Sequence, residues 1–224
     1  IAASVIGEPP VPTAGLAVNW AYRFMRSLSI FSAIAITDAE LGTAKQYLQT
    51  WLAAGLHGEM HYMERHAALR MAPDLLQTGT MRIITARMDY LTDSLEAESV
   101  LADPTCAYVS RYALGRDYHK VLRGQLQRLA TLIEREIGPY GYRVFTDSAP
   151  VMEVELARKS GLGWRGKHTL LLSREGGSYF FLGGILTDLE LPTDTPVSEH
   201  CGGCTRCIDV CPTQADRKST RLNS

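Results

Sequence analysis

Four cysteines near the end of the chain constrain this sequence more than any other feature. They lie within eleven residues in the pattern C-x2-C-x2-C-x3-C-P, at Cys201, Cys204, Cys207 and Cys211. This spacing is that of ferredoxin-type [4Fe–4S] sites, where the fourth cysteine serves the other cluster of a two-cluster module. Structural zinc sites usually present two separated cysteine pairs instead. The run therefore favours an iron–sulfur module, with a zinc site as the alternative.

One such run supplies only half the ligands of a two-cluster module, so we expect the other ligands beyond this sequence. The remaining cysteine, Cys106, lies in a segment that we interpret as a strand, with its thiol as a small buried group. Five cysteines in 224 residues, four of them in one ligand cluster, are typical of a reducing compartment.

No targeting or membrane segment is visible in the sequence. No apolar run approaches the ~20 residues of a membrane span, and there is no basic and apolar leader. We therefore expect a cytoplasmic protein with no membrane partner. Residues 1–16 are expected to be disordered or artefactual. Residues 216–224 are expected to be a non-native tail, because they resemble the translation of a sequencing-library adapter; a native basic, polar tail is the alternative.

Strands and helices are predicted to interleave irregularly, which favours an α+β sandwich over a βαβ repeat. A capping box from Thr37 to Glu40 predicts a helix directly after the first strand. A stripe from Leu122 to Ile137 predicts a longer helix, and Met152–Ser160 a shorter one. Strands are predicted over 31–36, 81–91, 106–112 and 142–145, and a hairpin joins 169–173 to 178–191 through the turn 174–177.

Three further segments precede the cysteine run: Tyr112-Ala-Leu-Gly-Arg-Asp-Tyr-His119, Thr146-Asp-Ser-Ala-Pro150 and Gly161-Leu-Gly-Trp-Arg-Gly-Lys-His168. In this order and spacing, and with the cysteine run after them, they make the chain resemble the epoxyqueuosine reductase family from about Phe31 to Ala215. The resemblance implies a cobalamin-binding α/β sandwich domain over 17–191. The start of a ferredoxin-like [4Fe–4S] module is then expected over 192–215.

The resemblance also implies a function. Family members reduce epoxyqueuosine to queuosine at the wobble position of tRNA, using cobalamin that an external electron donor reduces through iron–sulfur clusters. We therefore expect tRNA as a partner, and a monomeric protein. The net charge is only −1, but residues 111–174 hold twelve Lys and Arg against six Asp and Glu. This basic stretch could face a phosphate backbone.

Asp147 is the catalytic residue that the resemblance implies, as the proton donor to the oxygen that leaves the epoxide. The structural alternative is a cap for the helix near Met152. Asp117 is interpreted as an ion-pair partner or helix cap. Tyr112 and Tyr118 are expected either to pack on a corrin or to fill the core.

Four further residues are expected to bind the cofactor. Arg70 and Ser110 are placed among the cobalamin contacts by resemblance, with surface positions as the alternative. Lys167 and His168 follow a Gly-rich turn, a setting suited to the phosphate of the cobalamin nucleotide tail or of tRNA. Their alternative is a solvated turn. Gly184 departs from the family pattern, which usually has Glu at this position.

Two other functions use the same features. A reductive dehalogenase-like enzyme would keep cobalamin and the clusters but act on a different substrate. A ferredoxin-type electron carrier with a non-catalytic module would need the cysteines, but it would have no use for Arg70, Asp147 or the Lys167 turn.

Overall fold

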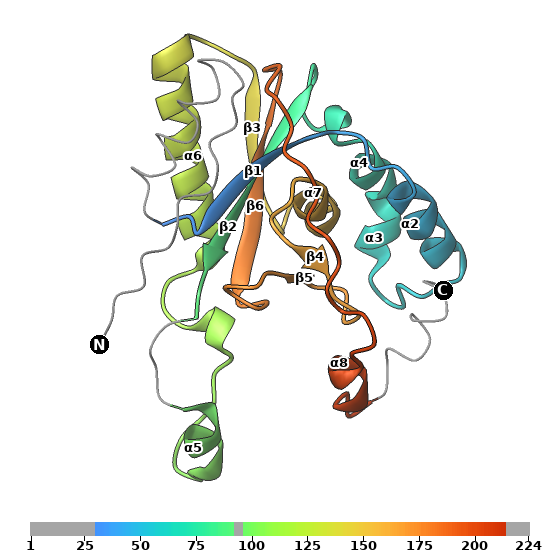
Figure 1. The fold of residues 1–224 in the computed structure, drawn as a ribbon, viewed down its shortest axis with the longest axis vertical. Helices are drawn as coiled ribbons and strands as arrows, with labels where there is room; N and C mark the ends of the chain where they lie inside the picture. The colour runs from blue at the N-terminus through green and yellow to red at the C-terminus, as the bar shows by residue number, and fades with distance from the viewer. Residues whose placement is uncertain (1–29, 92–95, 214–224) are drawn as a thin grey trace.

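The computed structural model describes residues 30–91 and 96–213 of the chain. Its centre is a four-stranded antiparallel sheet with the spatial order β1-β2-β6-β3 (Figure 1). Helices cover both faces, so the predicted α+β sandwich is confirmed. The expectations for residues 1–16 and 216–224 lie outside the described residues. The four strands are β1 (Ala33–Asp38), β2 (Arg82–Asp89), β3 (Tyr142–Thr146) and β6 (Phe180–Thr187).

Helix α6 (Tyr118–Ile137) packs along one face of the sheet (Figure 1). Its apolar residues recur every three to four positions and therefore lie on one side of the helix. This side is buried against Ile84, Ala86 and Ile185 of the central strands. The helix ends before Gly138, whose φ of 90° is accessible to glycine without strain. The buried stripe includes Leu122, Leu126, Leu129 and Ile133.

The opposite face carries the shorter helix α7 (Glu153–Lys159). Its Leu156 is fully buried in a cluster with Ile83, Phe145 and Leu186. A two-stranded ribbon of β4 and β5 packs against the same helix, and three short helices lie further out (Figure 1). These elements are β4 (Trp164–Arg165), β5 (Leu171–Leu172), α2 (Ala44–Ala53), α3 (His61–Arg65) and α4 (Ala67–Met71), which the 3-10 turn η1 (Pro73–Leu75) follows.

The central strands are covered on both sides, which explains why six consecutive residues of β2, from Ile83 to Met88, are all buried. Ile83 packs in the α7 layer and its neighbour Ile84 in the α6 layer. In β6, a Cβ atom on Gly184 would overlap the Ile84 carbonyl oxygen and lie 2.8 Å from the Phe145 ring. Packing therefore requires glycine at this position in the present chain.

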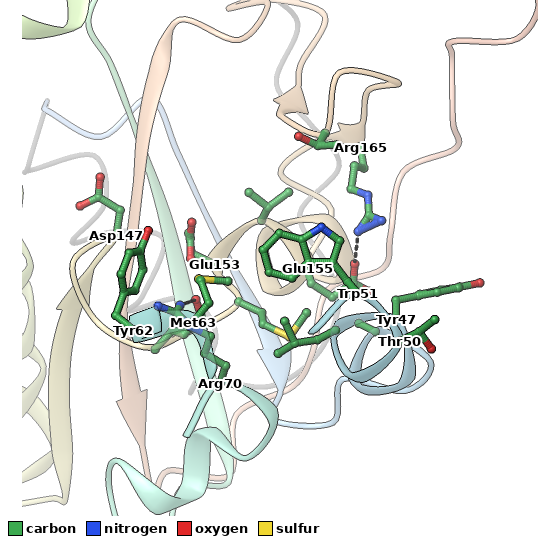
Figure 2. Close-up of a pocket in the computed structure, with 16 residues that line it drawn as sticks. Tyr47, Thr50, Trp51, Tyr62, Met63, Arg70, Asp147, Glu153, Glu155 and Arg165 are labelled. Atoms are coloured by element: carbon green, nitrogen blue, oxygen red, sulfur yellow. Dashed lines mark hydrogen bonds and ion pairs between the residues drawn. The ribbon is translucent and has the colours of Figure 1, made fainter. Parts of the chain in front are cut away.

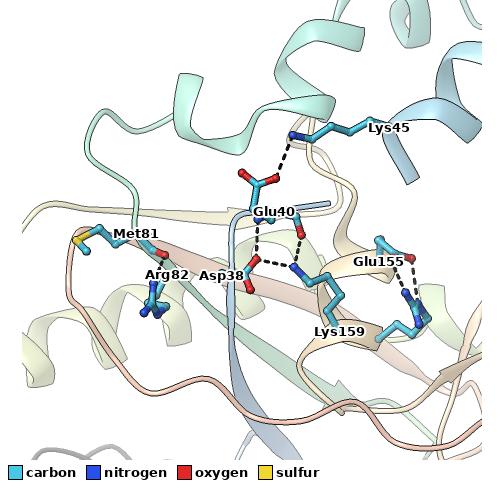
Figure 3. Close-up of polar contacts among 8 residues, drawn as sticks. Asp38, Glu40, Lys45, Met81, Arg82, Glu155 and Lys159 are labelled. Atoms are coloured by element: carbon cyan, nitrogen blue, oxygen red, sulfur yellow. Dashed lines mark hydrogen bonds and ion pairs between the residues drawn. The ribbon is translucent and has the colours of Figure 1, made fainter. Parts of the chain in front are cut away.

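Polar contacts at the end of β1 fix the position of α7 (Figure 3). The Asp38 carboxylate accepts hydrogen bonds from the Glu40 backbone N–H at 2.7 Å and from Lys159 Nζ at 2.6 Å. Burial acts to raise the pKa of Asp38, but these donors outweigh it and hold the pKa below its usual value. Lys159 also donates to the Glu40 carbonyl. A second pair, buried Glu155 and Arg158 (2.6 Å), lies one turn earlier on α7.

After β6 the chain runs as an extended strap, residues 192–200, without helix or strand (Figure 1). The strap covers the outer edge of β1. Asp194 accepts from the Ile36 N–H through its carboxylate, and its own N–H donates to the Ile36 carbonyl, both at 2.8 Å. The Thr195 carbonyl oxygen lies so close to Gly161 that a Cβ atom on Gly161 would overlap it. The strap leads into the cysteine loop and the short helix α8 (Arg206–Asp209).

Three element predictions are wrong. Residues 106–112 form no strand; they are exposed coil and the 3-10 turn η2 (Arg111–Ala113), and Cys106 is exposed instead of buried. Thr37 does not cap a helix, because it lies buried inside β1, and α2 begins only after Thr43. Residues 169–173 form no hairpin with β6: β5 pairs with β4, and a single bridge joins Ser173 to Gly177.

The segment before α6 projects away from the sheet and includes α5 (Ala97–Ala102) (Figure 1). Within the described ranges, we find no helix with the length and apolar character needed to cross a membrane.

Candidate active site

A cavity of about 660 Å³ opens between α2, the α3–α4 segment and the first turn of α7 (Figure 2). Its size is typical of small-molecule sites. Apolar and aromatic side chains, including Trp51 and Met63, form much of the wall. Charged side chains lie in two groups. The first group is Arg70, Asp147 and Glu153, and the second is the ion pair of Arg165 with Glu155 (3.9 Å).

Asp147 directly follows β3, so the end of the sheet positions it. Its Oδ2 accepts a hydrogen bond from the Tyr118 hydroxyl at 2.5 Å, and its Oδ1 lies 3.2 Å from His119 Nε2. The Tyr118 ring in turn stacks on Phe181, with centroids 3.9 Å apart. The helix-cap alternative is not what the structure shows, since α7 begins after Met152 without a side-chain cap. Two partners from α6 therefore orient a partly exposed carboxylate at the cavity.

Asp117 has the structural role expected of it. It caps the N-terminus of α6 by accepting from the His119 N–H at 3.0 Å, and its carboxylate is also 3.0 Å from His119 Nδ1. The His119 hydrogen bond lowers the pKa of Asp117. His119 thus lies between two carboxylates, one at each ring nitrogen.

Tyr118 has a raised pKa because it is partly buried and donates to Asp147, so the phenol remains a donor at neutral pH. Tyr112 is mostly exposed and meets the Tyr118 ring edge-on.

Glu153 is the acidic residue that the sequence analysis missed. It is the first residue of α7 and lines the same cavity. Burial raises its pKa to about 7, the nearby Asp147 raises it further, and Arg70 acts in the opposite direction. Its position three residues after the Thr146–Pro150 segment was the signal available in the sequence.

Arg70 lies in the cavity wall as expected for a ligand contact. Its guanidinium is 6.0 Å from the centroid of the Tyr62 ring, and Nη1 makes a long contact of 3.5 Å to the Val151 carbonyl. Its Nε is buried and lacks a hydrogen-bond partner among the described residues. A buried donor of this kind is costly unless it is paired. Because the periphery of cobalamin carries amide and phosphate oxygens, which are acceptors, the residues present fit such a ligand.

The other expected cofactor residues lie away from the lining of this cavity. Ser110 is exposed and precedes the η2 turn. His168 accepts from the Leu170 N–H within its own turn. Lys167 donates to two carbonyls of the cysteine loop, from Gly202 at 2.8 Å and Cys204 at 2.9 Å. Arg70 and Asp147 are therefore the two expected residues that line the cavity together.

None of the four cysteines of the loop, all of which the structure describes, is in a disulfide. A turn closed by the Cys204 N–H and the Cys201 carbonyl (2.8 Å) begins the loop, and α8 carries Cys207. In the part of the chain that the structure describes, no three His, Cys, Asp or Glu side chains are grouped to hold a single metal ion. The donor set of the loop, thiols from one continuous run, fits the ligands of a cubane.

Fold and site together define a class: an α+β sandwich domain with a largely apolar cavity that holds charged side chains, joined by an extended strap to a loop with four closely spaced cysteines. The family model described as "Epoxyqueuosine reductase QueG, DUF1730" matches residues 70–148, which include both Arg70 and Asp147. An epoxyqueuosine reductase of Xanthomonas campestris pv. campestris is 55% identical over 195 residues, which make up 87% of this chain and 55% of that protein.

Solved structures agree with this relationship. The structure of epoxyqueuosine reductase from Streptococcus thermophilus is 27% identical and has a TM-score of 0.73, covering 89% of this chain and 53% of its own. A crystal structure of epoxyqueuosine reductase with an epoxyqueuosine-modified tRNA-Tyr stem loop, 24% identical, shares the fold with a TM-score of 0.75 over 89% of this chain and 52% of its own. The chain belongs to the epoxyqueuosine reductase family and spans about half the length of the relatives that it matches.

Proposed function

We propose that this chain forms the cobalamin-binding domain and the start of the iron–sulfur module of an oxidoreductase that reduces epoxyqueuosine to queuosine in tRNA. One observation supports this most strongly. The Asp147 carboxylate lies in the wall of a large cavity, in a chain that is 55% identical to a named epoxyqueuosine reductase. The structure of a family protein with a modified tRNA stem loop supports tRNA as the carrier of the substrate.

The reaction needs protons that the site can provide. Removing an epoxide oxygen as water consumes two electrons and two protons. Asp147 would transfer one proton to the leaving oxygen, while Tyr118 and His119 hold its carboxyl group in place, and the second proton would come from solvent. Cobalamin, when bound, supplies the cobalt redox chemistry that amino-acid side chains lack. Arg70 would donate from its unpaired Nε to an acceptor on the corrin periphery.

Electrons would enter through the cysteine loop from an external donor. Cys201, Cys204 and Cys207 would bind one cubane, and Cys211 would serve the second. We also propose that the reaction takes place in the cytoplasm, because a run of cysteine ligands without disulfides suits a reducing compartment. We propose a monomeric protein.

The tRNA backbone would meet the exposed basic residues of α6. Of the twelve cations between 111 and 174, several make contacts within the protein, including Arg158, Lys159, Arg165 and Lys167. Cations on the outer side of α6 stay exposed and can bind phosphates. They are Lys120, Arg123, Arg128 and Arg135.

The test uses the protein at full family length, with this chain as its first part. Purified without oxygen and given cobalamin, it should retain the corrin through gel filtration. With a chemical reductant it should convert epoxyqueuosine in tRNA to queuosine. Arg70→Leu should lose most of the retained corrin, whereas the matched cation variant Lys45→Gln, outside the cavity lining, should keep it.

Other outcomes would redirect the assignment. Elution without corrin absorbance, but with reducible iron–sulfur clusters, would favour the electron carrier. Retention of corrin with turnover of an organohalide, and none of epoxyqueuosine, would favour the dehalogenase-like activity.

A further inference from the structure

The cysteine loop is held to the sandwich domain by one side chain in particular. Lys167, in the turn between β4 and β5, donates from Nζ to the Gly202 carbonyl at 2.8 Å and to the Cys204 carbonyl at 2.9 Å. Both acceptors belong to the turn from Cys201 to Cys204, the first two proposed cluster ligands: Gly202 lies inside it and Cys204 ends it. An ammonium has three donors, so two of the three are committed to this loop.

Neighbouring contacts bring the loop to the same place. His200, immediately before Cys201, meets the Trp164 ring edge-on at 4.9 Å and lies 3.3 Å from Arg174 Nη2. Trp164 belongs to β4, and Arg174 follows β5. The β4–β5 ribbon, which also packs on α7, therefore supports the start of the cysteine loop.

We propose that Lys167 is a positioning residue for the iron–sulfur loop: it fixes the Cys201–Cys204 turn against the sandwich domain and supplies a positive charge beside the cluster. This inference rests on the proposed iron–sulfur function. It replaces the phosphate-binding role expected for Lys167 from the sequence.

Peptide geometry explains why this contact matters for a cluster. In a planar trans peptide the carbonyl and the following N–H point in opposite directions. Holding the Gly202 and Cys204 carbonyls on Lys167 therefore directs the N–H groups of Gly203 and Thr205 away from it. Backbone N–H groups that bond the cluster sulfurs are one of the factors that set the reduction potential.

The charge acts in the same direction. Reduction adds a negative charge to a cluster, and a neighbouring ammonium stabilises that charge. Loss of Lys167 should therefore make reduction harder and shift the midpoint potential to a more negative value. Lys167→Arg keeps the charge but replaces a compact three-donor group by a planar fork. In this variant the midpoint potential should therefore lie close to that of the wild type, whereas the loop should be held less firmly.

The first test is hydrogen exchange of the 224-residue chain, measured by mass spectrometry. In Lys167→Gln, peptides from the loop 200–210 should exchange about tenfold faster, the factor expected when hydrogen bonds of this kind are lost. Peptides from α6 and β2 should be unchanged. Lys45→Gln, which removes a cation outside this contact, should exchange like the wild type. A wild-type exchange pattern across the loop in Lys167→Gln would overturn the proposal.

The second test is the midpoint potential of the reconstituted clusters at full family length, followed by electron paramagnetic resonance. Lys167→Gln should shift it to a more negative value while corrin content stays normal. An unchanged potential would refute the role of the charge. Absence of iron from the wild-type protein would instead refute the proposed function itself, so the two failures are distinguishable.

Discussion

At the residue scale, the Asp147 carboxylate in the cavity wall is held by side chains from outside the cavity lining. Asp147 is bonded to Tyr118 and lies beside His119, and Asp117 holds the other side of that imidazole. Each partner comes from the first turn of α6 or its cap, so a single helix end orients the group.

Asp147→Asn should separate chemistry from structure. The amide oxygen can still accept from Tyr118, but the side chain no longer carries a transferable proton. Single-turnover conversion of epoxyqueuosine in tRNA, with chemically supplied electrons, should slow by ~10²–10⁴-fold. Corrin and iron contents should stay normal. Near-wild-type turnover would remove Asp147 from the mechanism.

Glu153 should make stability depend on pH. Its pKa rises from an ordinary 4.5 to about 7 in the folded protein because the group is buried. The folded state then binds more protons than the unfolded state between these two values, so stability falls as pH rises from about 5 to about 7. Glu153→Gln removes this dependence. The wild type should lose up to ~3 kcal/mol relative to the variant across this window.

Urea unfolding of both proteins at pH 5 and pH 8 measures this difference. Other titrating groups are common to the two proteins and cancel. Parallel stability profiles for the wild type and Glu153→Gln would show that Glu153 has an ordinary pKa.

At the element scale, periodic segments were predictable and segments that depend on distant partners were not. The apolar stripe of α6 repeats on one side from Leu122 to Ile133, about three turns, so its sequence alone indicates the helix. The β-prone residues near Tyr108 suggested a strand, yet no strand of the described sheet lies beside them. Pairing of β5 with β4 depends on how α7 packs, which a local pattern does not contain.

The site divides in the same way. Arg70 and Asp147 were expected to be functional from the family resemblance, and both line the cavity. The desolvation of Glu153 and the contact of Lys167 with the cysteine loop both depend on residues that are distant in the sequence and that the fold brings together. Neither is visible in the residue type or its neighbours.

Gly184→Ala should destabilise the sheet. The added methyl group would overlap the Ile84 carbonyl and lie 2.8 Å from the Phe145 ring, both in the buried core. We expect a loss of about 1–3 kcal/mol from overpacking. Gly124→Ala is the matched control, because no atom lies within 4 Å of its Cβ position in α6. That change should stabilise by up to ~1 kcal/mol through helix propensity.

Thermal unfolding of the two alanine variants gives the comparison directly. Equal melting temperatures for Gly184→Ala and the wild type would contradict the close packing of β6.

At the scale of the whole molecule, we propose that the described domain is one part of a longer electron path. The chain spans 55% of a relative that it matches, and the cysteine run would supply only part of a two-cluster ligand set. A protein of full family length should therefore carry iron and sulfide for about two cubanes. The 224-residue chain should form at most one incomplete, oxygen-labile cluster. Stoichiometric zinc without iron in the full-length protein would contradict this.

The strap over β1 has a consequence for synthesis on the ribosome. Strands β1, β2, β3 and β6 are all translated before Asp194, whose two hydrogen bonds cover the outer edge of β1. Until residue 194 leaves the exit tunnel, this nascent sheet presents an open edge to which another chain can add. The cysteine loop follows within a few residues, so closure of the edge and arrival of the cluster ligands nearly coincide. A chain whose translation ends between β6 and the strap would therefore expose the edge of β1, would be prone to aggregate, and would lack the metal ligands.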